Sequence, residues 1–208
     1  MVQFGNSPRG LILKALPGTE PPGVWSSNLH QTSIVNHQDH VSLLSKGISE
    51  PGGVWADFGA GRGAFTLALA ELLGPTAVIH AIDKDKRALQ EQTRLMSTRF
   101  PGVTVHYHPT DFTAPLSLPP LNGIVAANTL HFLRHKDQTL RLWRSYLKEN
   151  GRLLIVEYNV DRGNFWVPYP FSYPTWEKLA VKNGFTTTRL LVKRPSRFLG
   201  EIYSAVSW

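Results

Sequence analysis

A glycine-rich loop is the feature of this sequence whose residue types and spacing best suit ligand chemistry. It reads Asp57-Phe58-Gly59-Ala60-Gly61-Arg62-Gly63 and joins an apolar stretch to a nearly all-apolar helical one. Glycines allow the backbone to pass close to a ligand and to adopt positive φ angles. The N–H groups that open a following helix then point at the polar end of the ligand. A carboxylate at Asp57 suits a cationic amino group and would repel a pyrophosphate.

Polar residues recur at the points where later strands are expected to end. Asp83 follows the second apolar stretch, Asp111 the third and Asn128 the fourth. Each has a local alternative, since Asp83 or Asn128 could cap the structure that follows and Asp111 could be a turn residue. Ligands of open α/β sheets bind beyond the carboxyl ends of the strands, so this repetition indicates one shared site.

The elements that would position these residues alternate between strand and helix patterns. Strands are predicted at 54–58, 76–82, 103–108, 121–127, 152–158, 185–193 and 198–207. Helices are predicted at 37–46, 64–73, 84–100, 135–148 and 173–182. Such alternation indicates an α/β fold with a mostly parallel sheet and helices on both faces. The link Arg194-Pro195-Ser196 is too short for a crossover, so the C-terminal strand should run antiparallel to its partner.

The chain divides into two predicted parts. Residues 1–50 comprise an arm rich in Gly, Pro, Ser and Asn and then a short helix that we expect to cover the site; residues 51–208 form the α/β domain. The hydrophobic fraction of 42% is ordinary for a globular chain. The absence of cysteine excludes disulfides, zinc–thiolate sites and thiol nucleophiles. We find no signal peptide and no 18-residue apolar run, so we expect no membrane span and a cytoplasmic location.

The formal net charge of +7 bears on the choice of partner. A basic surface attracts nucleic acid or anionic lipid. The basic residues are spread, however, and their densest segments are 84–87, 134–148 and 189–197. Each segment is more simply a solvated face of a helix or strand, so nucleic acid is an alternative partner and not the favoured one.

The loop D-x-G-x-G-x-G and the polar strand ends together resemble the core of class I S-adenosyl-L-methionine (SAM)-dependent methyltransferases. The resemblance runs from about Val54 to the C-terminus. It implies a Rossmann-like fold, with a seven-stranded, mostly parallel sheet and an antiparallel C-terminal strand, and SAM as the cofactor. The cofactor-binding residues that it implies are Asp57, Gly59, Ala60, Gly61 and Gly63 at the methionine part, Asp83 at the ribose with Lys84 next to it in the sequence, Asp111 and Phe112 at the adenine, and Asn128 near the methionine part or the acceptor.

The resemblance also narrows the methyl acceptor. The segment 126–131 lacks the Asn/Asp-Pro-Pro-aromatic box that is typical of methylation at exocyclic base amines, and no cysteine is present for C5-pyrimidine or arsenic chemistry. Thr175-Trp176 through Leu179-Ala180, followed by Asn183-Gly184-Phe185, resembles the small-molecule group of the quinone-biosynthesis type. We therefore expect O- or C-methylation of a small, planar or apolar acceptor.

Candidate acceptor-side residues lie after the fourth and fifth predicted strands. An aromatic, proline-rich connection at 159–174 predicts a pocket wall from Trp166, Tyr169 and Phe171, although these rings could instead only pack the loop down. His131 is the first candidate for a general base, or is a structural histidine, and Tyr158 is a second candidate. His37, on the N-terminal helix, is predicted to help close the site.

Three other functions remain open from the sequence. The charge allows an RNA- or protein-directed methyltransferase. Gly59, Gly61 and Ala64 formally match the dinucleotide fingerprint G-x-G-x-x-A of an NAD(P)-dependent oxidoreductase, against which Asp57 and the antiparallel strand argue. A SAM-binding protein without catalysis is the third. His106 and His108 share a strand face but lack a carboxylate or thiol companion, so no metal site is predicted.

Overall fold

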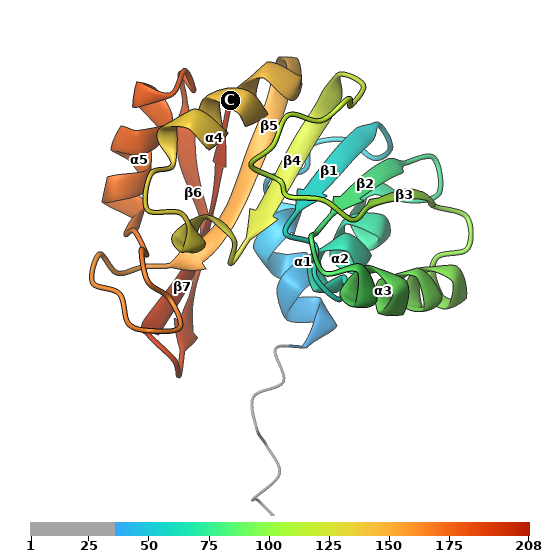
Figure 1. Ribbon diagram of the computed structural model, residues 1–208, viewed down its shortest axis with the longest axis horizontal. Helices are drawn as coiled ribbons and strands as arrows, with labels where there is room; N and C mark the ends of the chain where they lie inside the picture. Colours follow the sequence, from blue (N-terminus) through green and yellow to red (C-terminus); the bar gives the residue numbers. More distant parts are fainter. Residues whose placement is uncertain (1–35) are drawn as a thin grey trace, which may run out of the picture. The chain divides into compact units, whose positions relative to one another are not determined.

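Seven strands form one sheet in the order β3-β2-β1-β4-β5-β7-β6 (Figure 1). Their bounds are β1 Val54–Phe58, β2 Val78–Ile82, β3 Thr104–His108, β4 Leu121–Ala127, β5 Leu147–Tyr158, β6 Thr188–Ser196 and β7 Gly200–Ser207. Strand β7 alone runs in the direction opposite to the other six, which confirms the predicted antiparallel C-terminal strand. The structure is a computed structural model and describes residues 36–208; the arm predicted at 1–35 lies outside the described residues.

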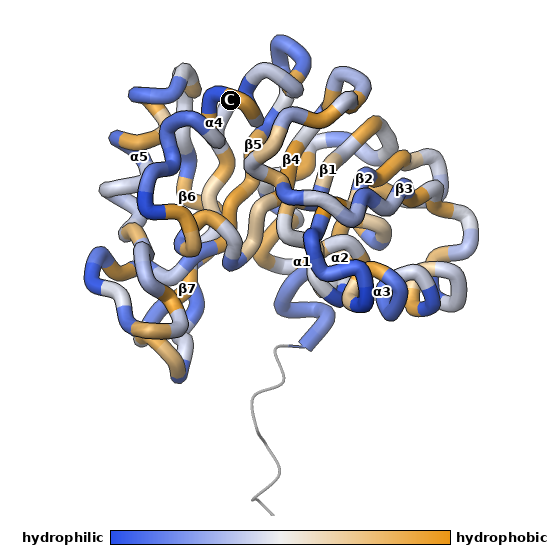
Figure 2. Tube along the Cα trace, in the orientation of Figure 1, coloured by the Kyte–Doolittle hydropathy of each residue, from blue (hydrophilic) through white to orange (hydrophobic). Residues whose placement is uncertain are grey.

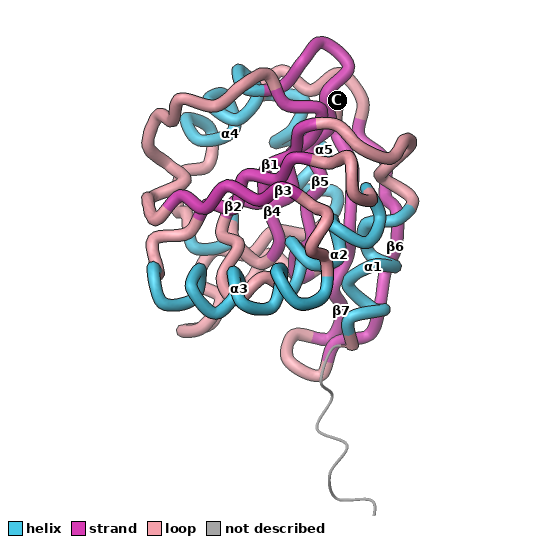
Figure 3. The backbone as a smooth tube through the Cα atoms, turned by 90° about the vertical axis from the view of Figure 1, so that its right-hand side faces the viewer, coloured by secondary structure: helices cyan, strands magenta, loops and turns pink. Residues whose placement is uncertain are grey.

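Helices cover both faces of this sheet (Figures 1 and 3). They are α1 His37–Ser45, α2 Ala64–Leu73, α3 Lys86–Arg99, the short 3-10 helix η1 Leu130–Phe132, α4 Asp137–Tyr146 and α5 Tyr173–Lys182. One core lies between the sheet and α1, α2 and α3, and the other between the sheet and α4 and α5. In the part of the chain that the structure describes, no helix is long and apolar enough to span a bilayer.

The central strands are buried on both faces, and alternate residues supply the two cores. Trp55 of β1 faces the core with α1 and α2, whereas Ala56 and Phe58 face the core with α4. This two-sided burial explains why the parallel strands read as continuous apolar runs. The buried indole of Trp143 donates a hydrogen bond to the carbonyl of Phe112, which ties the loop after β3 to α4.

Several predicted boundaries are wrong; for example, the helix predicted at 135–148 ends at Tyr146, and β5 begins at Leu147, five residues before the predicted strand. Two further corrections concern named residues. The turn between β6 and β7 lies at 197–199, because Pro195 and Ser196 still pair with β7; β6 is an edge strand, where a proline costs no ladder hydrogen bond. The second correction concerns α3, which begins at Lys86, two residues later than predicted. Asp85 is its N-cap and accepts hydrogen bonds from the N–H groups of Arg87 and Ala88, so Asp83 is not the cap.

Gly123 of β4 leaves the space that the ring of Trp55 fills. A methyl group at Gly123 would lie 2.1 Å from Cζ3 of Trp55. We expect Gly123→Ala to lower the free energy of unfolding by about 1–3 kcal/mol through overpacking, measured as a shift in the urea midpoint. Gly102→Ala, whose nearest neighbour would lie 3.2 Å away, is the control. Equal midpoints for both variants would contradict this account.

Candidate functional site

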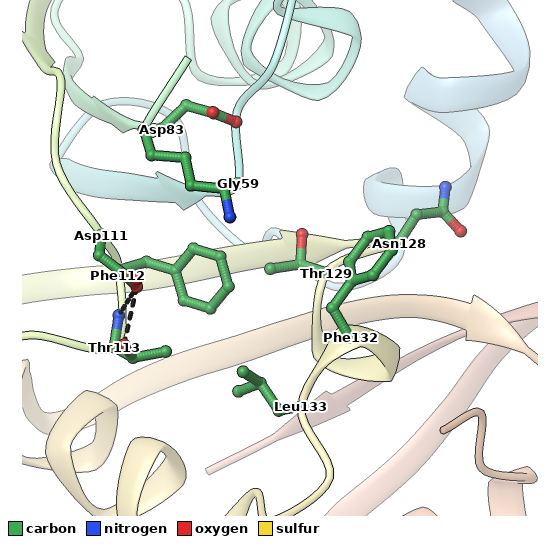
Figure 4. Close-up of a pocket in the computed structure, with 10 residues that line it drawn as sticks. Gly59, Asp83, Asp111, Phe112, Thr113, Asn128, Thr129, Phe132 and Leu133 are labelled. Carbon is green, nitrogen blue, oxygen red and sulfur yellow. Dashed lines mark hydrogen bonds between the residues drawn. The ribbon is translucent and has the colours of Figure 1, made fainter. Parts of the chain in front are cut away.

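A cavity of about 470 Å³ opens at the carboxyl ends of the strands (Figure 4). Its walls come from the loops that follow β1, β2, β3 and β4, and the lining residues are Gly59, Asp83, Lys84, Asp111, Phe112, Thr113, Asn128, Thr129, Phe132 and Leu133. The structure thus brings together Gly59, Asp83, Lys84, Asp111, Phe112 and Asn128 of the predicted cofactor residues. Asp57, Ala60, Gly61 and Gly63 lie in or beside the same loop but do not line the cavity.

The glycine loop is held close to the turn after β4. Gly59 has a φ of 78°, and a methyl group there would lie 2.4 Å from Oγ1 of Thr129. The Thr129 hydroxyl donates to a backbone carbonyl, with Phe58 O at 3.1 Å and Ala127 O at 2.9 Å. A side chain at Gly59 would therefore push apart the two loops that form the cavity.

Two carboxylates face the cavity from successive loops. The Oδ2 atom of Asp83 accepts a hydrogen bond from the N–H of Gly61 at 2.8 Å, and its Oδ1 accepts one from Asp85. Each of these oxygens keeps acceptor capacity for a ligand. Asp111 accepts from the backbone and hydroxyl of Thr113, and these hydrogen bonds lower the pKa of its carboxyl. Asp111 is therefore an anionic acceptor at neutral pH.

Asn128 combines backbone strain with an unsatisfied polar atom. Its φ of 52° is the one positive value at a non-glycine residue within 36–208. Its Oδ1 is buried and makes no hydrogen bond to any residue that the structure describes. Backbone strain and a buried polar atom without a hydrogen bond are together typical of a ligand-binding position.

Asp57 lies beneath the loop and not on the cavity wall. It is buried, and its Oδ2 accepts a hydrogen bond from the Thr66 hydroxyl at 2.6 Å. Burial raises the pKa of the Asp57 carboxyl to about 7, against the opposing effect of the Thr66 hydrogen bond. A cation bound at the loop would stabilise its ionised form.

A buried histidine–glutamate pair lies next to the cavity. His131 Nδ1 is 2.6 Å from Oε2 of Glu157, and both side chains are buried. The other carboxylate oxygen, Oε1, accepts the backbone N–H groups of residues 129, 130 and 131. The ring of Phe132, which lines the cavity, lies 4.3 Å from that of His131. This arrangement fixes the histidine ring, and in the tautomer whose Nδ1–H donates to Glu157 the Nε2 atom is an acceptor.

The other predicted acceptor residues do not line the cavity. Phe171 is buried against Trp176 in the core, and Trp166 and Tyr169 are exposed on the connection between β5 and α5. Tyr158 is half-buried, with its ring 6.1 Å from that of His131. His37 of α1 pairs with Glu71 of α2 at 2.6 Å.

The histidines of β3 form a ladder with a third histidine that the sequence analysis did not include. His80 of β2 stacks on His106 and its Nδ1 lies 3.0 Å from Nε2 of His108. Burial, followed by the neighbouring histidines, lowers the pKa of His80 to about 4. No group of three or more His, Cys, Asp or Glu residues within 36–208 could hold a metal ion.

Sequence reasoning missed Glu157 and the turn residues Thr129, Phe132 and Leu133. The sequence does hold one signal for Glu157, since this glutamate lies inside the apolar run of β5. A charged residue is almost never fully buried unless it is paired, so its position indicates a buried partner. Its partner could not be read from the sequence, since the two residues meet only through the pairing of β4 with β5.

The sequence around the glycine loop is similar to known methyltransferases. Residues 56–153 match the family model described as a methyltransferase domain. The chain is 33% identical over 75 residues to the ribosomal RNA small subunit methyltransferase H of Paracidovorax citrulli (strain AAC00-1). That alignment covers 36% of this chain and 24% of the relative, so the matched region spans about a quarter of the relative's length.

Solved structures share the fold over most of the chain. The YcgJ protein from Bacillus subtilis has a TM-score of 0.66 and 13% identity, with 82% of this chain and 98% of that chain covered. Magnesium protoporphyrin IX methyltransferase from Synechocystis PCC 6803, solved with bound SAM, has a TM-score of 0.61 and 18% identity, with 82% and 77% covered. The predicted Rossmann-like methyltransferase fold is thereby confirmed.

The raised pKa of Asp57 predicts how stability depends on pH. Between pH 5 and pH 8 the unfolded carboxyl is ionised, whereas the folded one is protonated at pH 5 and ionised at pH 8. The folded chain thus binds the extra proton and loses stability as the pH rises. Asp57→Asn removes this loss, so its stability relative to the parent chain should grow by roughly 2–3 kcal/mol across that range.

Urea unfolding at several pH values would measure this difference. Asp137→Asn is the control, because hydrogen bonds from Asn183 and Lys182 lower the pKa of Asp137 and leave it ionised throughout the range. A stability difference for Asp57→Asn that stays constant with pH would show that the carboxyl does not titrate there.

Proposed function

We propose that this chain, which carries a class I SAM-dependent methyltransferase domain, transfers a methyl group from SAM to a small, planar or apolar acceptor at oxygen or carbon. The observation that carries the proposal is the cavity itself. It joins donors and acceptors suited to SAM on one side to an apolar wall beside the His131–Glu157 pair on the other.

The residues present fit SAM in three places. Asp83 would hold the ribose diol, for which each carboxylate oxygen has acceptor capacity left. Asp111 and Phe112 would contact the adenine through its amino group and its ring face. Asn128, with its orphan Oδ1, and Asp57, with its raised pKa, would serve the cationic methionine part.

When it is bound, SAM supplies a methyl group already activated on a sulfonium centre. The chain therefore has to position the acceptor, exclude water and, where the acceptor is acidic, remove a proton. We assign the proton removal to Nε2 of His131. Glu157 is the positioning residue, because its carboxylate accepts Nδ1–H and keeps that tautomer. Phe132, which lines the cavity, contacts the histidine ring, with 4.3 Å between the two ring centres.

The cavity favours a small acceptor over RNA. Phe112, Phe132 and Leu133 give its wall an apolar character, and its charged lining residues are two aspartates and Lys84. Two carboxylates among the lining residues do not favour a phosphate backbone. The ribosomal RNA methyltransferase relative therefore supports the class of reaction more than the acceptor.

Binding of S-adenosylhomocysteine tests the cofactor assignment. We expect calorimetry to detect it, and Asp83→Asn to weaken it by roughly tenfold to a hundredfold, because a charged hydrogen-bond acceptor is lost. Asp85→Asn is the matched control, since it keeps the helix cap and lies outside the cavity lining. No binding of S-adenosylhomocysteine, or a preference for NADH, would overturn the cofactor assignment.

Glu157→Gln tests the pair directly. The glutamine oxygen can still accept the backbone N–H groups, but its amide would donate to Nδ1 and so place the proton on Nε2. We expect methyl transfer to fall by roughly 10²–10⁴-fold with S-adenosylhomocysteine affinity unchanged. His131→Gln should behave alike. Full transfer activity in both variants, measured on any acceptor found by screening, would exclude the pair from proton transfer.

A further inference from the structure

Five large aromatic side chains are exposed on three loops around the site. Phe132 follows β4 and is 59% exposed, and Phe198 lies between β6 and β7 and is 47% exposed. The other three lie between β5 and α5 and are Phe165 (88% exposed), Trp166 (68%) and Tyr169 (41%). We call these residues the aromatic rim. Exposed aromatic groups of this kind mark interaction surfaces when they gather in one place.

Several contacts bring the three loops together. The N–H of Tyr169, on the β5–α5 connection, donates to the carbonyl of His131 at 3.0 Å. The ring of Tyr158, at the end of β5, lies 6.1 Å from His131 and 5.6 Å from Phe198. Because Tyr158 pairs with Ile202, the turn at 197–199 extends past the end of β5. Figure 1 shows the β5–α5 connection and this turn at the same end of the sheet.

The exposure of Phe165 and Trp166 is built into the loop. Asn164 Oδ1 accepts the N–H groups of both Trp166 and Val167, and Val167 is buried as an anchor. Asp161 accepts the N–H and the hydroxyl of Ser172 and thereby ties the two ends of the loop together. The two rings contact each other edge to face at 5.3 Å. A hydrogen-bonded turn thus presents an apolar pair to solvent.

Basic residues lie on the same loops. Arg134 and Arg162 are exposed and lie within a few residues of the aromatic groups. Of the nearby acids, Glu201 forms an ion pair with Lys193, and Asp161 accepts hydrogen bonds from Ser172. Figure 2 shows hydrophobic and hydrophilic stretches alternating along the β5–α5 connection. The rim is therefore apolar at its tips and basic beside them.

We propose that the aromatic rim docks on an anionic lipid bilayer. Aromatic side chains suit the membrane interface because the ring enters the acyl boundary while polar neighbours stay hydrated. Arginines beside them add attraction to anionic headgroups, about fivefold in affinity for each. Single-stranded nucleic acid would instead need rings lying open along a groove for base stacking, whereas Phe165 and Phe198 lie on two separate loops, β5–α5 and β6–β7.

Docking would place the acceptor entrance at the bilayer. Phe132 belongs to the rim and also lines the cavity, so an apolar acceptor could pass from the lipid to the site beside it. This consequence rests on the proposed methyl transfer, whereas the binding to lipid does not.

Vesicle co-sedimentation of the full chain tests the docking. The probes are vesicles of pure phosphatidylcholine and of an equimolar mixture with phosphatidylglycerol. We expect binding to the mixed vesicles, reduced at least tenfold in a Phe165→Ala, Trp166→Ala double variant and about fivefold in Arg162→Gln. A Leu95→Ala, Val181→Ala double variant is the control, because it removes exposed apolar side chains from α3 and α5.

The outcomes separate this inference from the proposed function. Docking would be supported if the rim variants lose vesicle binding and the control variant keeps it. An absence of vesicle binding, equal binding by all variants, or binding of a single-stranded oligonucleotide in place of vesicles would overturn it. Retained S-adenosylhomocysteine binding in the rim variant would show that only the lipid surface was lost, whereas an intact lipid response without S-adenosylhomocysteine binding would reject the proposed function alone.

Discussion

The buried carboxylate of Glu157 holds the turn after β4, which borders the proposed acceptor side of the cavity. A buried carboxylate is costly unless hydrogen bonds replace its lost water, and here three backbone N–H groups and the His131 ring do so. Those donors all come from the turn after β4. The hydrogen bonds to Glu157 therefore hold this turn in its observed conformation. Through this turn Glu157 sets the positions of Thr129 under the glycine loop and Phe132 on the cavity wall.

A second buried carboxylate, that of Asp57, lies in a contrasting environment. Its Thr66 hydrogen bond does not offset the burial, and the pKa of Asp57 is raised to about 7. Glu157 thus receives its hydrogen-bond donors from within the fold, whereas an added positive charge would stabilise the ionised form of Asp57. The strained Asn128 has a buried Oδ1 that accepts no hydrogen bond from the described residues. A cationic donor such as the amino-acid part of the proposed cofactor would suit both side chains.

The cofactor side could be predicted from the sequence because its signals are local. A glycine loop after a strand, and polar residues at later strand ends, converge whenever the strands are parallel, so Asp83, Asp111 and Asn128 reach one cavity by topology alone. The acceptor side depends on packing between distant segments. Glu157 meets His131 only through strand register, and Phe171 enters the core while Trp166 stays in solvent, although both lie on one connection. Aromatic content cannot distinguish these two outcomes.

The two halves of the site also differ in how the fold supports them. The proposed cofactor half is built on the connections that follow β1, β2 and β3. Backbone hydrogen bonds from Gly59 to Ile82 and from Asp83 to His108 tie the starts of these connections to one another. The proposed acceptor half includes the β5–α5 connection, whose exposed rings are held by side-chain hydrogen bonds of Asn164 and Asp161. Substitutions of the exposed rings leave the cores untouched, because the anchoring contacts involve Val167 and Ser172 and not the rings at the tips. Under the proposed function, surface attachment can therefore change without altering cofactor binding, whereas the turn held by Glu157 lies against both halves of the proposed site.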